Sequence, residues 1–222
     1  MIPIAWMNIH GERRLGTLNL VKGVAVYGEK LVKHKGEEYR LWDPFRSKLA
    51  GALENGLSEP PLFNRSKVLY LGASTGTTVS HISDIVGLEG IVFAVESSSR
   101  VGRELLQNVA SKRENIVPIL EDARRPDHYF SIFGMVDVVY CDIAQPDQTE
   151  IAIKNCWLYL KPSGTLLLVI KTRSIDVIQD PRRIIAQEAK KLQAYQFIVK
   201  QIIKLEPFDK DHALISAVYR SK

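Results

Sequence analysis

Residues 67–96 read KVLYLGASTGTTVSHISDIVGLEGIVFAVE, and this stretch decides the fold. Apolar runs at 68–71 and 91–95 predict two strands. Between them, a turn rich in glycine and small residues leads into apolar residues at helical spacing from Val79 to Val86. Parallel strands need a crossover of about this length. The order of strand, turn, helix and strand therefore predicts one nucleotide-binding βαβ unit.

The residue types in this unit indicate a ligand. Gly72 and Gly76 lack a Cβ atom, which lets a ligand approach the backbone closely. Thr77 and Thr78 stand at the predicted helix start, where free N–H groups favour an anion. Glu96 ends the second strand and is placed to accept hydrogen bonds from a ribose diol. The dinucleotide spacing G-x-G-x-x-G is absent, so a nucleoside with a small anion fits better than a pyrophosphate. A plain turn in an α/β core is the alternative.

Composition bounds the class of protein. The chain has 222 residues, of which 45% are hydrophobic and 25% charged, as in ordinary soluble domains. No apolar run approaches the roughly 20 residues of a membrane span, and the N-terminus is a poor signal peptide, so we expect a cytoplasmic protein without a membrane partner. Cys141 and Cys156 lie in apolar contexts, and the five histidines have no ligand spacing, so we expect no disulfide and no metal site. A net charge of +5 permits a polyanionic partner.

The remaining apolar runs extend the sheet. They predict further strands at 116–120, 136–141, 165–170, 197–205 and 213–219, with helical patterns between the earlier ones. Pro118 predicts an edge position for its strand, because proline cannot donate to a neighbouring strand. A βαβαβ series closed by a hairpin predicts an α/β, seven-stranded, Rossmann-like class I methyltransferase fold, mostly parallel with the last strand antiparallel.

The N-terminal segment follows a different pattern. Short strand-like pieces separated by Gly-Glu turns predict a small antiparallel β-meander, and these pieces lie at 6–9, 16–21, 24–27 and 31–32. A helix should follow, with Asp43 as its N-cap and Pro44 as its first residue, and end near Asn55. We expect residues 1–56 to form this extension and 57–222 the methyltransferase domain, with Pro60 and Pro61 in the linker between them.

Polar residues follow several strands at their carboxyl ends, where ligands bind in open α/β sheets. Asp142 comes after the run 136–141 and Lys171 after the run 165–170, so we expect both at one edge. Asp122 follows the third strand and is placed to accept a hydrogen bond from an adenine amino group. Lys48 lies beside the apolar face of its helix, where a lysine is most often a surface residue. His212 begins the last strand.

Several longer phrases carry a resemblance. WDPFRSKLA, YLGASTGTTVSHISDIVG, YCDIAQPDQ, VIKTRSID and FDKDHALI occur in this order, and the chain resembles the fibrillarins, in their short archaeal form, from about residue 5 to its end. The resemblance implies an S-adenosylmethionine-dependent 2′-O-methyltransferase of rRNA, and also of tRNA. It implies a ribonucleoprotein with a box C/D guide RNA, a Nop-family scaffold protein and a kink-turn-binding protein.

The resemblance also implies site residues. The catalytic group would be Lys48, Asp142, Lys171 and His212. The cofactor-binding residues would be Gly72, Ala73, Thr77, Thr78, Glu96, Ser97, Asp122, Ala123, Asp142, Ile143, Ala144 and Gln145. The family often has an aromatic residue against the adenosine at the position of Ser97.

Chemical roles can be assigned as hypotheses. The attacking hydroxyl must lose a proton, and Lys171 is our hypothesised general base. Asp142 would orient the amine and the methyl donor, and His212 would position the ribose or Lys48. Two alternatives stay open. An NAD-dependent oxidoreductase would require the missing G-x-G-x-x-G spacing, and a non-catalytic ribonucleoprotein subunit would not require Asp142 and Lys171.

Overall fold

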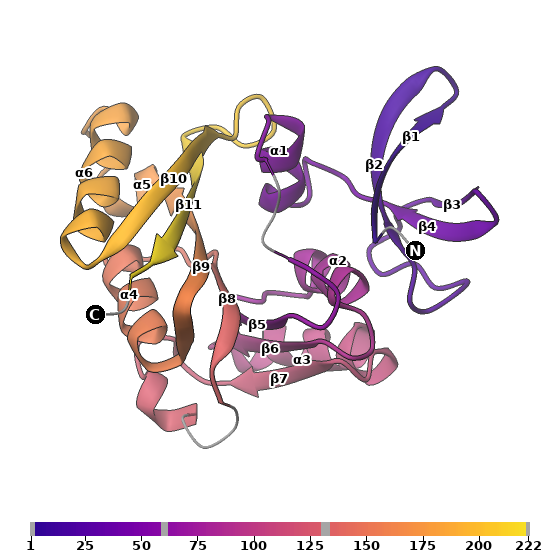
Figure 1. Cartoon of the computed structure of the whole chain (residues 1–222), viewed down its shortest axis with the longest axis horizontal. Helices are drawn as coiled ribbons and strands as arrows, with labels where there is room; N and C mark the ends of the chain where they lie inside the picture. Colours follow the sequence, from indigo (N-terminus) through magenta and orange to yellow (C-terminus); the bar gives the residue numbers. More distant parts are fainter. Residues whose placement is uncertain (1–2, 59–61, 130–133, 221–222) are drawn as a thin grey trace.

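The computed structural model describes residues 3–58, 62–129 and 134–220, and the predicted linker residues Pro60 and Pro61 lie outside them. Figure 1 shows a small N-terminal sheet beside a larger one. The small sheet comprises β1 (Ile4–Ile9), β2 (Glu12–Leu18), β3 (Leu31–His34) and β4 (Glu37–Leu41). The large sheet comprises β5 (Lys67–Leu71), β6 (Ile91–Glu96), β7 (Ile116–Leu120), β8 (Val136–Cys141), β9 (Leu160–Lys171), β10 (Phe197–Lys204) and β11 (His212–Tyr219). The helices are α1 (Lys48–Glu54), α2 (Thr77–Val86), α3 (Ser99–Asn108), α4 (Gln148–Tyr159), α5 (Thr172–Ile175) and α6 (Pro181–Ala194).

The large sheet has the predicted topology. Its strand order is β10-β11-β9-β8-β5-β6-β7, and neighbours from β9 to β7 run parallel. Strand β11 runs antiparallel to both β9 and β10. Strand β7 forms the outer edge, with Pro118 opposite Ala94, so the edge prediction is confirmed. The antiparallel N-terminal sheet, of order β1-β2-β4-β3, is confirmed as well.

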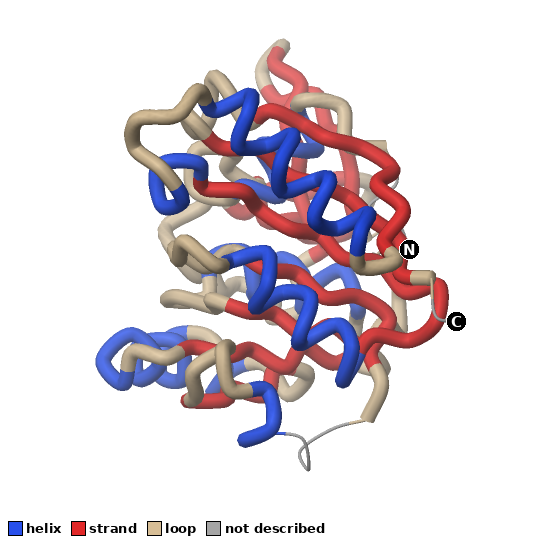
Figure 2. The backbone as a smooth tube through the Cα atoms, turned by 90° about the vertical axis from the view of Figure 1, so that its left-hand side faces the viewer, coloured by secondary structure: helices blue, strands red, loops and turns tan. Residues whose placement is uncertain are grey.

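Helices cover both faces of the large sheet, which explains why its central strands are apolar throughout. Helices α4 and α6 lie on the face turned to the viewer in Figure 2, and α1, α2 and α3 lie on the other face. Side chains of β5 alternate between the two cores. Leu69 and Leu71 pack with the α4 and α6 side, whereas Val68 and Tyr70 pack with the α2 side. Strand β5 is therefore packed on both faces up to its last residue, Leu71, and Gly72 follows directly.

Three local predictions were wrong. Helix α1 begins at Lys48, because Ser47 Oγ accepts a hydrogen bond from the main-chain N–H of Ala50 and caps the helix there. Asp43 instead accepts from the N–H of Phe45 and forms a turn. Residues 24–27 form no strand, because the Glu29 carboxylate accepts from main-chain N–H groups of this segment and holds it in a turn. The fourth strand of the small sheet, β4, was not predicted.

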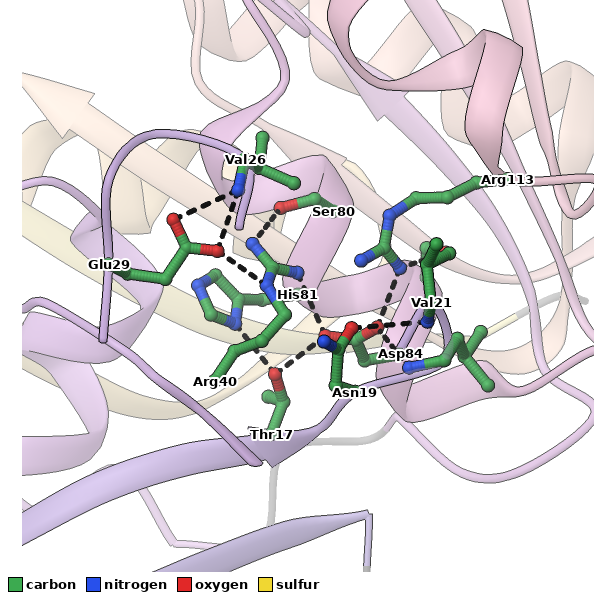
Figure 3. A network of polar contacts seen from close by, with 12 residues as sticks. Thr17, Asn19, Val21, Val26, Glu29, Arg40, Ser80, His81, Asp84 and Arg113 are labelled. Atoms are coloured by element: carbon green, nitrogen blue, oxygen red, sulfur yellow. Dashed lines mark hydrogen bonds and ion pairs between the residues drawn. The ribbon is translucent and has the colours of Figure 1, made fainter. Parts of the chain in front are cut away.

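A buried network of charges ties the small sheet to helix α2 (Figure 3). Arg40 of β4 contacts Asp84 of α2 at 2.9 Å and Glu29 at 2.6 Å, and Arg113 contacts the same Asp84 at 2.6 Å. None of these four side chains is more than 2% exposed. Two cations face two anions, so the cluster is neutral and each charge has a partner. This arrangement fixes α2, whose first turn follows the turn at Gly72.

His81 lies within this network and makes the fold sensitive to acid. Burial lowers the pKa of His81 well below 6.5, and the charges of Arg40 and Arg113 lower it further. The folded state thus binds this proton less readily than the unfolded chain. The contribution of neutral His81 to stability is therefore fully present above about pH 6.5 and decreases as the pH falls below it.

We expect the free energy of unfolding, measured with urea, to decrease from about pH 7.5 to about pH 5.5, and to decrease less in His81→Gln. An equal decrease in both proteins would contradict this role of His81. His10→Gln, which changes an exposed histidine, is the control.

Within the described ranges, none of the helices is long and apolar enough to cross a bilayer.

Candidate active site

A cavity of about 280 Å³ lies at the carboxyl ends of the parallel strands. Because β5, β6, β7, β8 and β9 all end here, their last residues and following loops converge on one space. Nine of the predicted cofactor-binding residues line it, namely Gly72, Glu96, Ser97, Asp122, Ala123, Asp142, Ile143, Ala144 and Gln145. Lys171, predicted to be catalytic, lines the same cavity.

The turn after β5 is shaped for close approach. Gly72 has a φ of +83°, and a Cβ atom there would lie 2.8 Å from the main-chain oxygen of Asp142. The Glu96 carboxylate accepts hydrogen bonds from the main-chain N–H groups of Ser74 and Ser98, each at 2.9 Å. These bonds fix the carboxylate at the cavity. Each oxygen retains acceptor capacity for a ribose hydroxyl.

The first turn of α2 departs from the expected arrangement. Ala73, Thr77 and Thr78 are absent from the residues that line the cavity. Thr78 is buried, and its hydroxyl lies 2.9 Å from that of Ser47, so this side chain joins α1 to α2. A Cβ atom on Gly76 would lie within 2.8 Å of Val109 and Leu105 side-chain atoms, so this glycine serves the packing of α2 against α3 and its neighbours.

The predicted catalytic residues are linked through carboxylates. Lys171 Nζ lies 2.8 Å from Asp142 Oδ1 and donates to the Asp142 main-chain oxygen at 2.9 Å. Lys48 Nζ contacts the other oxygen of Asp142 at 3.4 Å. Lys48 also lies 3.6 Å from Asp209, whose carboxylate is 2.9 Å from His212 Nδ1. All four predicted residues thus belong to one chain of contacts, with His212 connected through Asp209.

Packing brings the two distant members to the edge. Lys48 is the first residue of α1, which packs against β11. His212 begins β11 opposite Lys171 in the antiparallel register, so both side chains leave the same face of the sheet. The main-chain N–H of Lys171 donates to the side chain of buried Gln148, which fixes the end of β9.

Sequence reasoning missed Arg124. Its guanidinium contacts Asp147 at 2.7 and 3.2 Å and the side-chain oxygen of Gln145 at 2.8 Å. The hydrogen bonds to Asp147 raise the pKa of Arg124, so the guanidinium is charged. Arg124 and Gln145 line the cavity from two different loops, and the bidentate pair joins these loops. The only signal was the position of Arg124 just after Asp122.

Two other groups add no chemistry to the site. Burial raises the pKa of Cys141 to about 12, so the thiol before Asp142 is protonated and a poor nucleophile. Within residues 3–58, 62–129 and 134–220, no cluster of three or more metal-ligating side chains occurs.

The strand order, with one antiparallel strand beside β9 and the cavity at the parallel strand ends, defines the class I methyltransferase fold. Within this class the chain belongs to the fibrillarin family, whose model, described as "Fibrillarin", matches residues 4–221. It is 55% identical over 210 residues to a fibrillarin-like rRNA/tRNA 2′-O-methyltransferase of Saccharolobus islandicus, covering 95% of this chain and 90% of that protein.

Two solved structures are similar over almost the whole chain. Aeropyrum pernix fibrillarin, solved in complex with natively bound S-adenosyl-L-methionine, is 42% identical with a TM-score of 0.88, over 98% of this chain and 100% of that one. A chain in the structure of a fibrillarin/Nop5p complex is 37% identical with a TM-score of 0.87, over 100% of this chain and 99% of that one.

Proposed function

We propose that this protein transfers a methyl group from S-adenosylmethionine to the ribose 2′-hydroxyl of rRNA and tRNA, at sites chosen by a box C/D guide RNA. The observation that carries the proposal is the shared position of Asp142 and Lys171. Both line the donor cavity, and Asp142 contacts Lys171 and Lys48. Binding and catalytic residues therefore meet at one carboxylate. The activity named for the Saccharolobus relative supports the same chemistry.

The residues around the cavity fit the donor. Gly72 leaves room where a Cβ atom would meet the next strand end, and Glu96 offers a fixed carboxylate for the ribose diol. Asp122 supplies an acceptor at the end of β7 for the adenine amino group. Ser97 lines the cavity where the family often has an aromatic ring. When bound, the donor supplies an electrophilic methyl group on a positively charged sulfur.

Lys171 is the proposed general base for the ribose hydroxyl. Its Nζ atom lies 2.8 and 2.9 Å from two oxygens of Asp142, which fixes the direction of the amine, and the neutral amine is the form that accepts the proton. Lys48 contacts the same carboxylate and supplies a cation beside it. Asp142 thus orients both amines at the cavity. Fixed positions of this kind remove much of the entropic part of the barrier.

The surface beside the catalytic group suits RNA. Phe45, 68% exposed, and exposed Arg46 lie just before Lys48, and the Phe45 ring packs edge to face on Phe208, with 5.1 Å between centroids. A cation and an exposed ring provide phosphate and stacking contacts. The target sequence would be read by pairing with the guide RNA, so the protein needs to recognise only the shape of the RNA backbone and ribose.

The proposed particle contains further components. A Nop-family scaffold protein is supported by the similar chain solved in a fibrillarin/Nop5p complex. The guide RNA and a kink-turn-binding protein follow from the family resemblance alone. In this assembly the protein is the catalytic subunit.

Donor binding separates this proposal from the oxidoreductase alternative. We expect isothermal titration calorimetry to show binding of S-adenosylmethionine and none of NAD. Glu96→Ala should weaken donor binding, because it removes the carboxylate that the Ser74 and Ser98 N–H groups hold at the cavity. Binding of NAD in preference to S-adenosylmethionine would overturn the proposal.

Arg124 should slow release of the donor by joining the two loops. We expect Arg124→Ala to raise the dissociation rate of S-adenosylmethionine by about two- to fivefold, the modest effect typical of an exposed ion pair. Stopped-flow displacement measures this rate. Arg65→Ala breaks a more exposed pair with Glu89 away from the cavity and should leave the rate unchanged. Equal rates in wild type and Arg124→Ala would contradict the role given to this pair.

A further inference from the structure

Asp209 lies between Lys48 and His212 in the proposed catalytic group, although the sequence patterns did not single it out. It lies in the loop between β10 and β11, where its main-chain N–H donates to the carbonyl of Leu205 at 3.0 Å. One carboxylate oxygen is 3.6 Å from Lys48 Nζ and the other is 2.9 Å from His212 Nδ1. The side chain is 33% exposed, so it is partly shielded from water. A single carboxylate thus faces two members of the catalytic group at once.

From Lys171 to Asp209, amines and carboxylates alternate along the contacts of the group, and His212 follows at the end. The order is Lys171, Asp142, Lys48, Asp209 and His212, and each neighbouring pair lies within 3.6 Å. Lys48 is therefore held between two carboxylates. Among the described residues, Asp209 is the only side chain whose contacts join His212 to the other members.

The surroundings of His212 determine how its ring is presented. Nδ1 faces two acceptors, the Lys210 carbonyl at 2.6 Å and the Asp209 carboxylate at 2.9 Å. A nitrogen between two acceptors must carry the hydrogen, so the neutral ring is the Nδ1–H tautomer. Its Nε2 atom then carries a lone pair, which is suited to accept a hydrogen bond from a hydroxyl.

We propose that Asp209 is a positioning residue of the methyl-transfer reaction. It acts through two neighbours: it holds Lys48 against Asp142, and it holds the His212 ring so that Nε2 accepts from the ribose 2′-hydroxyl. His212 and Lys171 are opposite each other in the register, which places both groups on the face where the hydroxyl must lie. This inference rests on the proposed function.

The test compares two equal charge changes in one loop. Asp209→Asn removes the carboxylate charge but keeps the size of the side chain, and Asp211→Asn removes a charge two residues away that pairs with Arg173 instead. Methyl transfer is measured in a single turnover, with guide RNA, target RNA and partner proteins reconstituted. We expect Asp209→Ala to slow transfer by about 100-fold, the effect of misplacing a reacting group, and Asp209→Asn to slow it less. Asp211→Asn should retain the wild-type rate, and Asp209→Glu should recover part of it.

Two further readouts separate positioning from a loss of structure. The donor dissociation constant and the melting temperature should stay at wild-type values in Asp209→Asn, because the residue lies outside the lining of the donor cavity. The ¹⁵N NMR signals of the His212 ring should report the Nδ1–H tautomer in wild type and shift in Asp209→Ala. Wild-type rates in Asp209→Ala and Asp209→Asn, measured beside an active wild type, would overturn the inference. An inactive wild type would count against the proposed function instead.

Discussion

Lys171→Ala should lose methyl transfer by about 10²- to 10⁴-fold at saturating donor, the range that a positioned acid–base group contributes. Lys171 lies at the end of β9 with its amine on two oxygens of Asp142, so its truncation removes the proposed proton acceptor and a partner of that carboxylate. Single-turnover transfer in the reconstituted particle measures the loss. Near-normal transfer would show that the assignment of the base is wrong.

The same strand supplies the matched control. Lys161 lies near the start of β9 and pairs with Asp137 near the start of β8, at the end of these strands opposite to the cavity. Lys161→Ala removes the same type of side chain from the same strand, at a position that does not line the cavity, so we expect the wild-type rate. A similar loss in both variants would mean that the strand, and not the amine, is responsible.

Asp84→Ala should destabilise the fold by about 3–5 kcal/mol, the cost of removing one partner from a buried ion pair. Asp84 is completely buried and contacts both Arg40 and Arg113, so its loss leaves two buried guanidinium groups with Glu29 alone. Its carboxylate also accepts from the Thr17 hydroxyl and from the main-chain N–H of Leu20, which joins the small sheet to α2. Urea unfolding measures the change.

An exposed pair provides the comparison for this second prediction. Glu89 pairs with Arg65 at the surface, with both side chains more than 60% exposed. Glu89→Ala should change the free energy of unfolding by at most about 1 kcal/mol. Equal effects of Asp84→Ala and Glu89→Ala would show that the buried network does not hold the small sheet on the methyltransferase fold.

Local sequence patterns were sufficient to predict the large sheet and to place two of the four proposed catalytic residues at one edge of it. Strands buried on both faces appear in sequence as short apolar runs, and the residues that follow them must lie at one edge. Asp142 and Lys171 were therefore placed together from the residues alone. Gly72 and Glu96 were placed at the ligand edge by the same reasoning, and both line the cavity.

Contacts between distant segments were beyond such reasoning. Lys48 and His212 reach the edge only because α1 packs on β11, and the resemblance to fibrillarins, not periodicity, singled them out. Asp209 belongs to a charged loop, and no local pattern singled it out. The Arg40–Asp84 pair joins residues 44 positions apart, and nothing in either local sequence indicates a buried ion pair. The start of α1 was wrong because Asp43 and Ser47 are both plausible caps.

Mapping the methylated nucleotide tests the central claim most directly. The protein is combined with a guide RNA, a complementary target RNA, a Nop-family scaffold and a kink-turn-binding protein, and supplied with labelled S-adenosylmethionine. The account predicts one 2′-O-methyl group on the target nucleotide that the guide specifies, and none when the guide is omitted or its pairing is destroyed. Methylation without a guide, or on a base nitrogen, would contradict it.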